Sequence, residues 1–435
     1  MRVAIPRTRR RTPLASGDLL ITTDQGGTPL VKPLALREVS DTSMKDRILV
    51  LADDLTGALE AGAKFAGQGI RTLVSTELSL RPKGCDESIG VLVIDAETRH
   101  LPAAAAGERV RELAHAAGEQ GFRYLYKKTD STLRGNIASE LGALAEAFPG
   151  SALLYVPAYP RMGRTVKRGM LYVHGAPVSE TEFARDGLNP VKASSIAKVL
   201  PAGPLPVVCI APDDPAVAGR ATQPALLLCD GETDHDLEVA AKTFVQSASL
   251  RLAAGPAGFL HFLARLVNLP REPAAGLPVI RAALVVNGSQ HGVSVAQVRY
   301  AKAQGFGTVG ARDMEAAAAE RGWVILEWGE RLGAEPLEAA RRAGEVVPRA
   351  LAARFEALVV FGGDTAYAVL RALGAPALSP LGEVVEGVPI SRISARDLGA
   401  TPGTRGEDLY LITKAGGFGS ENVLLSIKEV LAGRL

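Results

Sequence analysis

The chain is poor in the residues that build disulfides and metal sites. Its 435 residues include only three cysteines, far apart at Cys85, Cys209 and Cys229, and six scattered histidines with no HExxH motif. We therefore expect neither a disulfide framework nor a zinc site, and a reducing cytoplasm is the expected compartment. Apolar runs stay short of the roughly 18 residues that span a bilayer. This predicts that the protein has no membrane partner.

An excess of charge of one sign is also missing. The 49 basic and 47 acidic residues leave a formal net charge of +2, which gives no broad electrostatic footprint for nucleic acid. The 47% hydrophobic and 22% charged residues are typical of a soluble globular protein. A chain of 435 residues exceeds one ordinary domain, so we expect two, each with a sizeable core.

The first 43 residues differ from the rest of the chain. They carry a basic run at 7–11 but no apolar segment of the kind found in a secretory signal. Met44 stands just before the first strand-like segment. We expect residues 1–43 to be a disordered extension or a misassigned start.

From Met44 onward, strand-like and helix-like segments alternate. Such alternation is typical of βαβ units and predicts an α/β fold with mostly parallel sheets flanked by helices. Strands are expected at 47–51, 71–76, 90–95, 124–126, 152–156, 225–229, 282–286, 357–361 and 409–413. Helices are expected at 56–68, 102–120, 136–148, 294–304, 337–354, 365–373 and 421–431, with another from about Asp236.

Three stretches interrupt this pattern. Residues 157–190 are rich in proline, glycine and aromatic residues and too long for a plain connection, which favours a functional loop or a β-arm. Residues 201–224 are rich in proline and alanine and are expected to form a surface excursion. Prolines and glycines gather again at 268–278. We interpret this last stretch as a linker between domains at 44–270 and 278–435.

The first polar motif is Asp53-Asp54-Leu55-Thr56-Gly57, where a strand enters a helix. A helix N-cap accounts for either Asp54 or Thr56 and leaves a further carboxylate over. Two adjacent carboxylates above a sheet are costly unless they meet hydroxyls, a cation or a metal. We interpret the motif as part of a ligand site.

A denser polar segment, 127–135, follows the strand at 124–126. One of its two lysines is expected to lie on a solvated face. The remaining residues suit an anion and a polyol, because Lys and Arg hold carboxylates or phosphates while Asp and Ser bind hydroxyls. They are Lys128, Thr129, Asp130, Ser131 and Arg134. Arg99 follows another strand end, and ligands of open α/β sheets bind beyond such ends, so we expect it in the same crevice.

The second half contains three turns between a strand and a helix, at 287–290, 361–365 and 413–419. Free N–H groups at glycine-rich turns of this kind can cradle phosphates, which indicates a nucleotide site. No GxxxxGK[ST] motif is present, which excludes a P-loop NTPase. A GxGxxG match at 305–310 follows a helix rather than a strand, so it predicts a helix stop and not a dinucleotide fingerprint.

Taken together and in this order, these motifs resemble the four-carbon acid sugar kinase family, formerly a domain of unknown function. The likeness covers most of residues 44–435. The segments that carry it are 53–57, 127–135, 157–164, 169–181, 230–237, 255–258, 287–289, 362–365 and 414–419. The chain departs from the family pattern at Gly187, where such kinases usually have proline, and at Gly417, where many have asparagine.

The resemblance implies an N-terminal domain that binds a hydroxy acid, a C-terminal domain that binds ATP, and an active site in the cleft between them. From the motifs and the resemblance, the acid is expected to contact Asp53, Asp54, Arg99, Lys128, Thr129, Asp130, Ser131 and Arg134. ATP is expected to contact Ser289, Gly362, Gly363, Asp364, Thr365, Gly416, Gly417, Phe418 and Gly419. Mg²⁺ would bridge the phosphates of ATP, and the sequence names no ligands for it.

The implied reaction is phosphorylation of the terminal hydroxyl of a threonate-type or erythronate-type acid. One of the cations in the acid-binding set would hold the carboxylate, and Asp53, Asp130 or Asp364 would act as general base. Two alternatives stay open: a kinase for 3-oxo-tetronate or another sugar acid, and a non-catalytic sensor of sugar acids and nucleotide. The sequence does not decide the stereochemistry of the acid or the oligomeric state, and it allows a homo-oligomer.

Overall fold

The computed structural model describes residues 47–433, apart from 201–204, 215–216, 274–275, 311, 320–321, 328–335, 353–354 and 399–407. It also gives two short antiparallel strands, β1 (Thr22–Thr23) and β2 (Pro29–Leu30). The prediction for residues 1–43 otherwise lies outside the described residues. Among the described residues, no helix combines the length and the apolar character needed to cross a bilayer.

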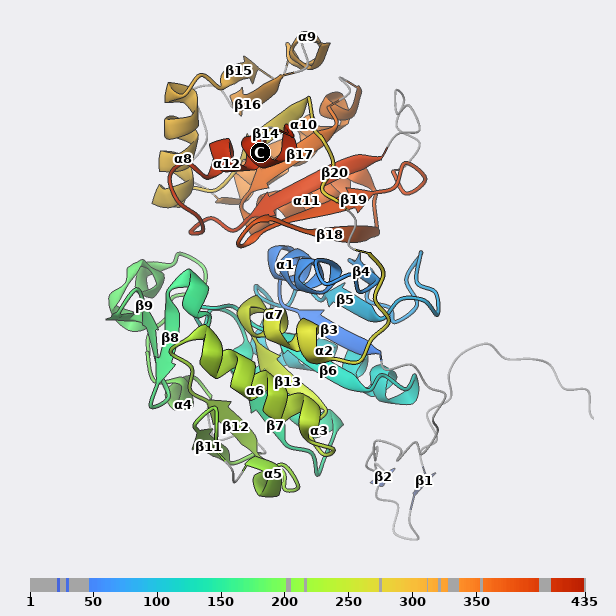
Figure 1. The fold of residues 1–435 in the computed structure, drawn as a ribbon, viewed down its shortest axis with the longest axis vertical. Helices are drawn as coiled ribbons and strands as arrows, with labels where there is room; N and C mark the ends of the chain where they lie inside the picture. Colours follow the sequence, from blue (N-terminus) through green and yellow to red (C-terminus); the bar gives the residue numbers. More distant parts are fainter. Residues whose placement is uncertain are drawn as a thin grey trace, which may run out of the picture.

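A row of parallel strands forms the sheet of the N-terminal part of the chain (Figure 1). In spatial order the strands are β11 (Val207–Ile210), β12 (Leu226–Cys229), β7 (Leu153–Tyr155), β13 (Leu252–Gly255), β6 (Tyr124–Lys128), β3 (Ile48–Ala52), β5 (Val91–Asp95) and β4 (Thr72–Ser75). Strand β3 is buried along its whole length, as expected where helices cover both faces of a parallel sheet.

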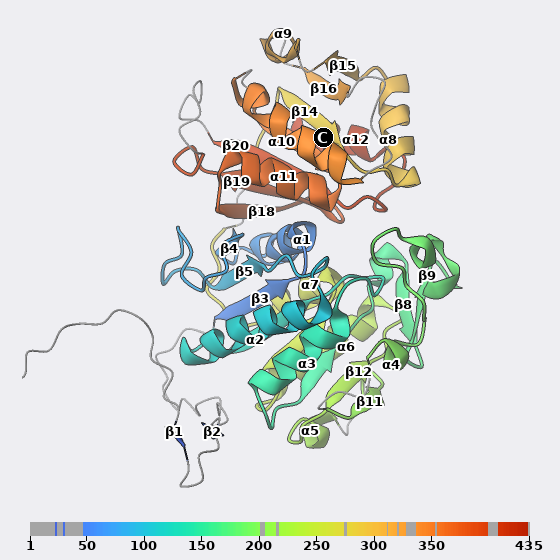
Figure 2. The same ribbon diagram turned by 180° about the vertical axis from the view of Figure 1, so that it is seen from behind.

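The longer helices of this part pack on the two faces of the sheet. They are α1 (Leu55–Ala66), α2 (Ala103–Glu119), α3 (Ile137–Ala147), α6 (Asp234–Gln246) and α7 (Ala257–Leu266). Two short helices, α4 (Ile196–Val199) and α5 (Val217–Arg220), lie outside these layers (Figures 1 and 2). Helices α6 and α7 lie in front of the sheet in Figure 1, whereas α2 and α3 lie in front of it in Figure 2. Their apolar sides build the core between these layers.

The C-terminal part contains a second row of parallel strands. In spatial order they are β20 (Leu409–Lys414), β17 (Ala357–Phe361), β14 (Ala283–Asn287), β16 (Trp323–Glu327) and β15 (Gly307–Gly310). Its helices are α8 (Gly292–Ala303), α9 (Met314–Ala319), α10 (Pro336–Ala352), α11 (Gly363–Leu373) and α12 (Val423–Leu431). Helices α10 and α11 lie on the face seen in Figure 2.

An antiparallel hairpin joins the two rows into one 15-stranded sheet. Its strands are β18 (Ala377–Val385) and β19 (Val388–Ile393). Strand β18 pairs with β4 of the N-terminal part, through Leu378 and Val74, while β19 pairs with β20. The two parts are therefore connected by main-chain hydrogen bonds as well as by the chain itself.

A β-arm projects beside the N-terminal sheet (Figure 1). It is a small antiparallel sheet of β8 (Arg164–Lys167), β9 (Met170–Val173) and β10 (Ala176–Pro177). Short 3₁₀ turns flank it: η1 (Pro160–Met162), η2 (Val178–Glu180) and η3 (Glu182–Arg185). The β-arm interpretation of 157–190 is thus confirmed.

The predicted α/β class, with mostly parallel strands and flanking helices, is confirmed. The helix stop is also confirmed, because α8 ends just before Gly305, which has a φ of +86°. The prediction of a surface excursion over 201–224 was wrong for the residues of β11, which form a strand at the edge of the sheet. The proline-rich residues on both sides of this strand concealed it in the sequence. The β18–β19 hairpin was not predicted, since Pro380 and Gly382 mark a register shift that breaks its alternation.

Candidate active site

The two aspartates at the end of β3 have different partners. Asp54 is the N-cap of α1, and its Oδ1 accepts a hydrogen bond of 2.9 Å from the Gly57 backbone. Asp53 is buried; its Oδ2 accepts from Arg99 Nε at 2.8 Å, while its Oδ1 has no hydrogen-bond partner among the residues that the structure describes. Burial alone would raise the pKa of Asp53, but the neighbouring cations hold it below its usual range.

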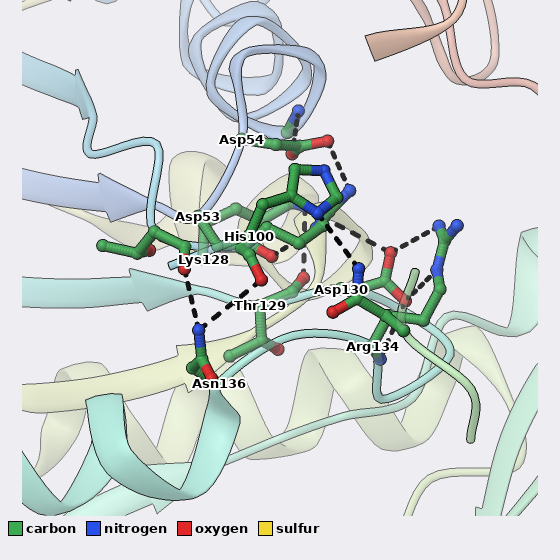
Figure 3. Close-up of polar contacts among 12 residues, drawn as sticks. Asp53, Asp54, His100, Lys128, Thr129, Asp130, Arg134 and Asn136 are labelled. Carbon is green, nitrogen blue, oxygen red and sulfur yellow. Dashed lines mark hydrogen bonds and ion pairs between the residues drawn. The ribbon is translucent and has the colours of Figure 1, made fainter. Parts of the chain in front are cut away.

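Arg99 lies among three carboxylates. Its guanidinium approaches Asp53 at 2.8 Å, Asp54 at 2.5 Å and Asp130 at 3.5 Å. These side chains come from the carboxyl ends of β3, β5 and β6, and Figure 3 shows the aspartates converging there. The structure therefore brings Arg99 into the predicted crevice, but most of its charge is already neutralised by the protein.

Asp130 organises the turn after β6. Its Oδ1 accepts from the Thr132 backbone at 2.8 Å and from the Thr132 hydroxyl at 2.5 Å, and its Oδ2 accepts from Arg134 Nη2 at 2.8 Å. Burial opposes ionisation, yet Arg134 and Arg99 hold the pKa of Asp130 well below its usual range. Arg134 also reaches Asp186 of the arm at 3.3 Å (Nη1 to Oδ2).

Both lysines at the end of β6 are buried. Lys127 Nζ lies 3.2 Å from Glu140 Oε2, whereas Lys128 Nζ donates to the Thr129 carbonyl at 3.1 Å. The prediction that one of these lysines lies on a solvated face was wrong, because β6 lies in the middle of the sheet. Lys128, Thr129 and Asp130 line neither of the two clefts described next.

The predicted nucleotide turns surround a cleft of about 800 Å³. Its lining includes Ser289, residues 362–365 and residues 416–418, together with Ser131 and Arg134 from the N-terminal part. The turns touch each other closely: a Cβ on Gly288 would lie 2.0 Å from Thr365 Oγ1, and one on Gly416 2.6 Å from Ser289 Oγ. Gly419 does not line the cleft, although it belongs to the same turn.

Lys414, which the sequence analysis did not assign to the site, is hydrogen-bonded to the backbone of the glycine-rich turn at 413–419. Its buried Nζ donates to the carbonyls of Ala415, Gly416 and Phe418 at 2.8, 3.1 and 3.0 Å. Burial lowers the pKa of Lys414 to about 7. Its position between a strand and a glycine-rich turn is a sequence signal that could have identified it as part of the site.

A smaller cleft of about 150 Å³ adjoins the first. Asp53, Asp54, Thr56 and Arg99 line it from the N-terminal part. Arg134, Asp186, Leu188, Gly363, Asp364, Ala415 and Gly416 line both clefts. Residues from both predicted sets, far apart in sequence, thus face a continuous space between the two parts of the chain, whereas Lys128, Thr129, Asp130 and Gly419 do not line it.

Two residues missed by the sequence analysis also line the smaller cleft. His100 Nε2 lies 3.4 Å from Asp364 Oδ1, so the two parts of the chain touch here. Burial raises the pKa of Glu97 to about 7, and the nearby Asp54 adds to the shift. Among the described residues, no group of three or more His, Cys, Asp or Glu is arranged to hold a metal ion.

Comparison with known proteins identifies both parts. A family model described as a sugar-binding N-terminal domain matches residues 48–263, and one described as a nucleotide-binding C-terminal domain matches residues 330–424. The chain is 32% identical to a D-threonate kinase of Bordetella bronchiseptica, over 88% of this chain and 97% of the relative. It is 27% identical to a 3-oxo-tetronate kinase of Brucella melitensis, over 88% and 95%.

The fold has solved counterparts. A Salmonella typhimurium LT2 crystal structure covers 87% of this chain and 98% of its own, with a TM-score of 0.67 and 22% identity. A Haemophilus influenzae structure covers 88% and 100%, with a TM-score of 0.65 and 19% identity. With the matched domains in this order and the D-threonate kinase likeness over nearly its whole length, the chain belongs to the four-carbon acid sugar kinase family.

Proposed function

We propose that this protein transfers the terminal phosphoryl group of ATP to the terminal hydroxyl of a four-carbon sugar acid of the threonate or erythronate type. One observation carries the proposal: Arg134 and Asp364 line both the acid-side cleft and the nucleotide-side cleft. An acid in the smaller cleft would therefore lie next to phosphates in the larger one. The proposal assigns acid binding to residues 44–270 and nucleotide binding to residues 278–435.

The acid-side cleft suits a polyol. Asp53 Oδ1 and Thr56 Oγ1 are buried and have no hydrogen-bond partner within the described part of the chain, and both residues line this cleft. A buried acceptor without a partner costs free energy that a ligand hydroxyl would recover. Arg134 also lines this cleft and, with Arg99 and Lys128 nearby, would attract the carboxylate of the acid.

The nucleotide-side cleft suits phosphates. Gly362 has a φ of +105°, and α11 begins directly after it, so backbone N–H groups at the helix start face the cleft. Asp364 stands at this helix start beside the acid-side cleft. We assign to Asp364, Asp53 or Asp130 the role of accepting the proton of the attacking hydroxyl.

Phosphoryl transfer depends chiefly on positioning and charge neutralisation, and Mg²⁺ would supply part of the latter when bound to the phosphates. In such sites Mg²⁺ is held by one or two carboxylates, substrate phosphates and water. Asp364 fits the role of that carboxylate, because it faces the nucleotide side and needs no further acidic cluster.

The experiment that tests the function is ADP release by the purified full chain with Mg-ATP. The acids are D- and L-threonate, D- and L-erythronate and their 3-oxo and 2-oxo counterparts. Turnover with threonate or erythronate that exceeds the acid-free rate would support the proposal. Turnover with a 3-oxo acid alone would replace the substrate, and ATP binding without turnover on any acid would favour the sensor alternative.

A further inference from the structure

Arg164 is a buried arginine whose charge has no carboxylate partner among the described residues. It opens strand β8 of the arm, and only 3% of its surface is exposed. Its Nη1 donates to the Met162 carbonyl, and its Nε finds no hydrogen-bond partner in the ranges that the structure describes. Within the part of the chain that the structure describes, no aspartate or glutamate forms an ion pair with it.

Two aromatic rings lie against the Arg164 guanidinium. The ring centroid of Phe418, in the glycine-rich turn of the C-terminal part, is 5.2 Å away, and that of Phe183, in the arm, is 5.9 Å away. Cation–π attraction offsets only part of the cost of burying a charge. Burial accordingly lowers the pKa of Arg164 below its ordinary value, although Asp130 and Glu182 act in the opposite direction.

The environment of Arg164 differs from that of two other arginines that line the clefts. Arg99 and Arg134 are both ion-paired with aspartates. Arg164 lines the larger cleft together with Ser289 and the glycine-rich turns, and it does not line the smaller one. A role confined to packing between the two rings would be met by an apolar side chain at lower cost.

We propose that Arg164 is a nucleotide-binding residue whose guanidinium holds a phosphate of the bound nucleotide. The inference rests on the proposed function only in placing the nucleotide in the larger cleft. A planar guanidinium with free donors matches two phosphate oxygens, and a phosphate supplies the negative partner that this buried charge lacks. Because Arg164 belongs to the arm and touches Phe418, a bound phosphate would tie the arm to the C-terminal part.

The test is equilibrium titration of the full chain with ADP and, separately, with adenosine, which lacks the phosphates. Arg164→Met removes the charge and keeps the apolar packing. It is expected to weaken ADP binding by about 10- to 100-fold, the range for a lost charged hydrogen bond, and to leave adenosine binding unchanged. The matched control is Arg161→Met, on the same arm but paired with Asp234 and outside the cleft lining; it should leave both affinities unchanged.

Other results would overturn the assignment. Unchanged ADP binding in Arg164→Met refutes it, as does an equal loss for ADP and adenosine, which indicates a structural role. Weaker threonate binding with normal ADP binding would indicate that Arg164 binds the carboxylate of the acid and not a phosphate of the nucleotide. If Arg164→Met does not fold, the Arg164→Lys variant decides. It keeps the positive charge but lacks the forked guanidinium, so it should bind ADP about tenfold less tightly. A folded Arg164→Lys variant with wild-type ADP affinity would refute the proposal.

These titrations need no sugar acid, so they separate the two proposals. A wild-type chain that is silent on every acid but binds ADP through Arg164 would refute the proposed function and keep this inference. An active kinase whose Arg164→Met variant binds ADP normally would do the reverse.

Discussion

His100 Nε2 and Asp364 Oδ1 lie 3.4 Å apart, on opposite sides of the space between the two parts of the chain. The hydrogen bond to Asp364 raises the pKa of His100, and the same contact lowers the pKa of Asp364. The attraction is therefore present while His100 is protonated and is lost as the pH rises through the raised His100 pKa. The contact between the candidate base and the acid-side cleft is thus pH-dependent.

This contact gives the first prediction. In an NMR titration of the histidine side chains, Asp364→Asn should return the His100 pKa toward its ordinary value of 6.5, because the carboxylate partner is gone. The His261 signal serves as the internal control, since burial lowers the pKa of His261 at a distance from Asp364. A His100 titration that is identical in the variant would contradict the pairing.

The second prediction concerns the buried aspartates. Asp53→Asn and Asp130→Asn should each lower kcat by about 10²- to 10⁴-fold, whether the residue acts as base or orients the substrate. Asparagine is the suitable substitute, because it keeps the shape of the side chain and an acceptor oxygen for Arg99 or Arg134 while it removes the charge of the carboxylate. Asp86→Asn, in an exposed turn, is the control. Near-normal rates in both Asp53→Asn and Asp130→Asn would exclude either as base.

A third prediction concerns Glu60, which is buried on α1 near Lys64 and Lys128. Burial raises its pKa against the opposing effect of these two lysines. Protonation of Glu60 thus contributes stability that is fully present below pH 4.5 and is lost as the pH rises through the raised value. Glu60→Gln mimics the protonated form, so it should stabilise the protein at pH 8 by on the order of 1 kcal/mol and have no effect near pH 4.

Urea unfolding at the two pH values measures this difference. Glu87→Gln, at an exposed position, should show no pH-dependent gain. If Glu60→Gln is less stable than the wild type at pH 8, the prediction is wrong. The ionised carboxylate would then stabilise the protein through its attraction to the two lysines.

The fourth prediction concerns Lys414 beneath the glycine-rich turn. Lys414→Met leaves three turn carbonyls without their donor, which should cost about 1–3 kcal/mol and weaken ADP binding. Burial lowers the Lys414 pKa to about 7, so the folded wild type contains a buried positive charge at Lys414 only below that pH. This buried charge destabilises the wild type at low pH. The variant should therefore be more destabilised, relative to the wild type, at pH 9 than at pH 6.

Denaturant unfolding at both pH values and an ADP titration at neutral pH measure these effects. The exposed Lys302, paired with Glu327, provides the control variant Lys302→Met. Equal destabilisation at the two pH values would contradict the lowered pKa, and normal ADP binding would show that the turn does not depend on Lys414.

Local sequence patterns predicted the strand ends of both halves well, because buried runs such as Ile48–Ala52 and Ala357–Phe361 are continuous and end at polar motifs. They also placed Arg99 in the same crevice as Asp53. They did not predict that Arg99 is shared by three aspartates, since that depends on which strands become neighbours in the sheet. Nor did they single out Arg164, whose unpaired charge is visible only once the arm is folded against Phe418.

The hairpin that joins the two rows of strands has a mechanical consequence. Strand β18 is bonded to β4 on one side and, through β19, to β20 on the other. A wide separation of the two halves would break the main-chain pairing of β18 with β4 at Leu378 and Val74. The pairing therefore opposes a wide opening of the space between the two halves, where the predicted acid-side and nucleotide-side residues meet.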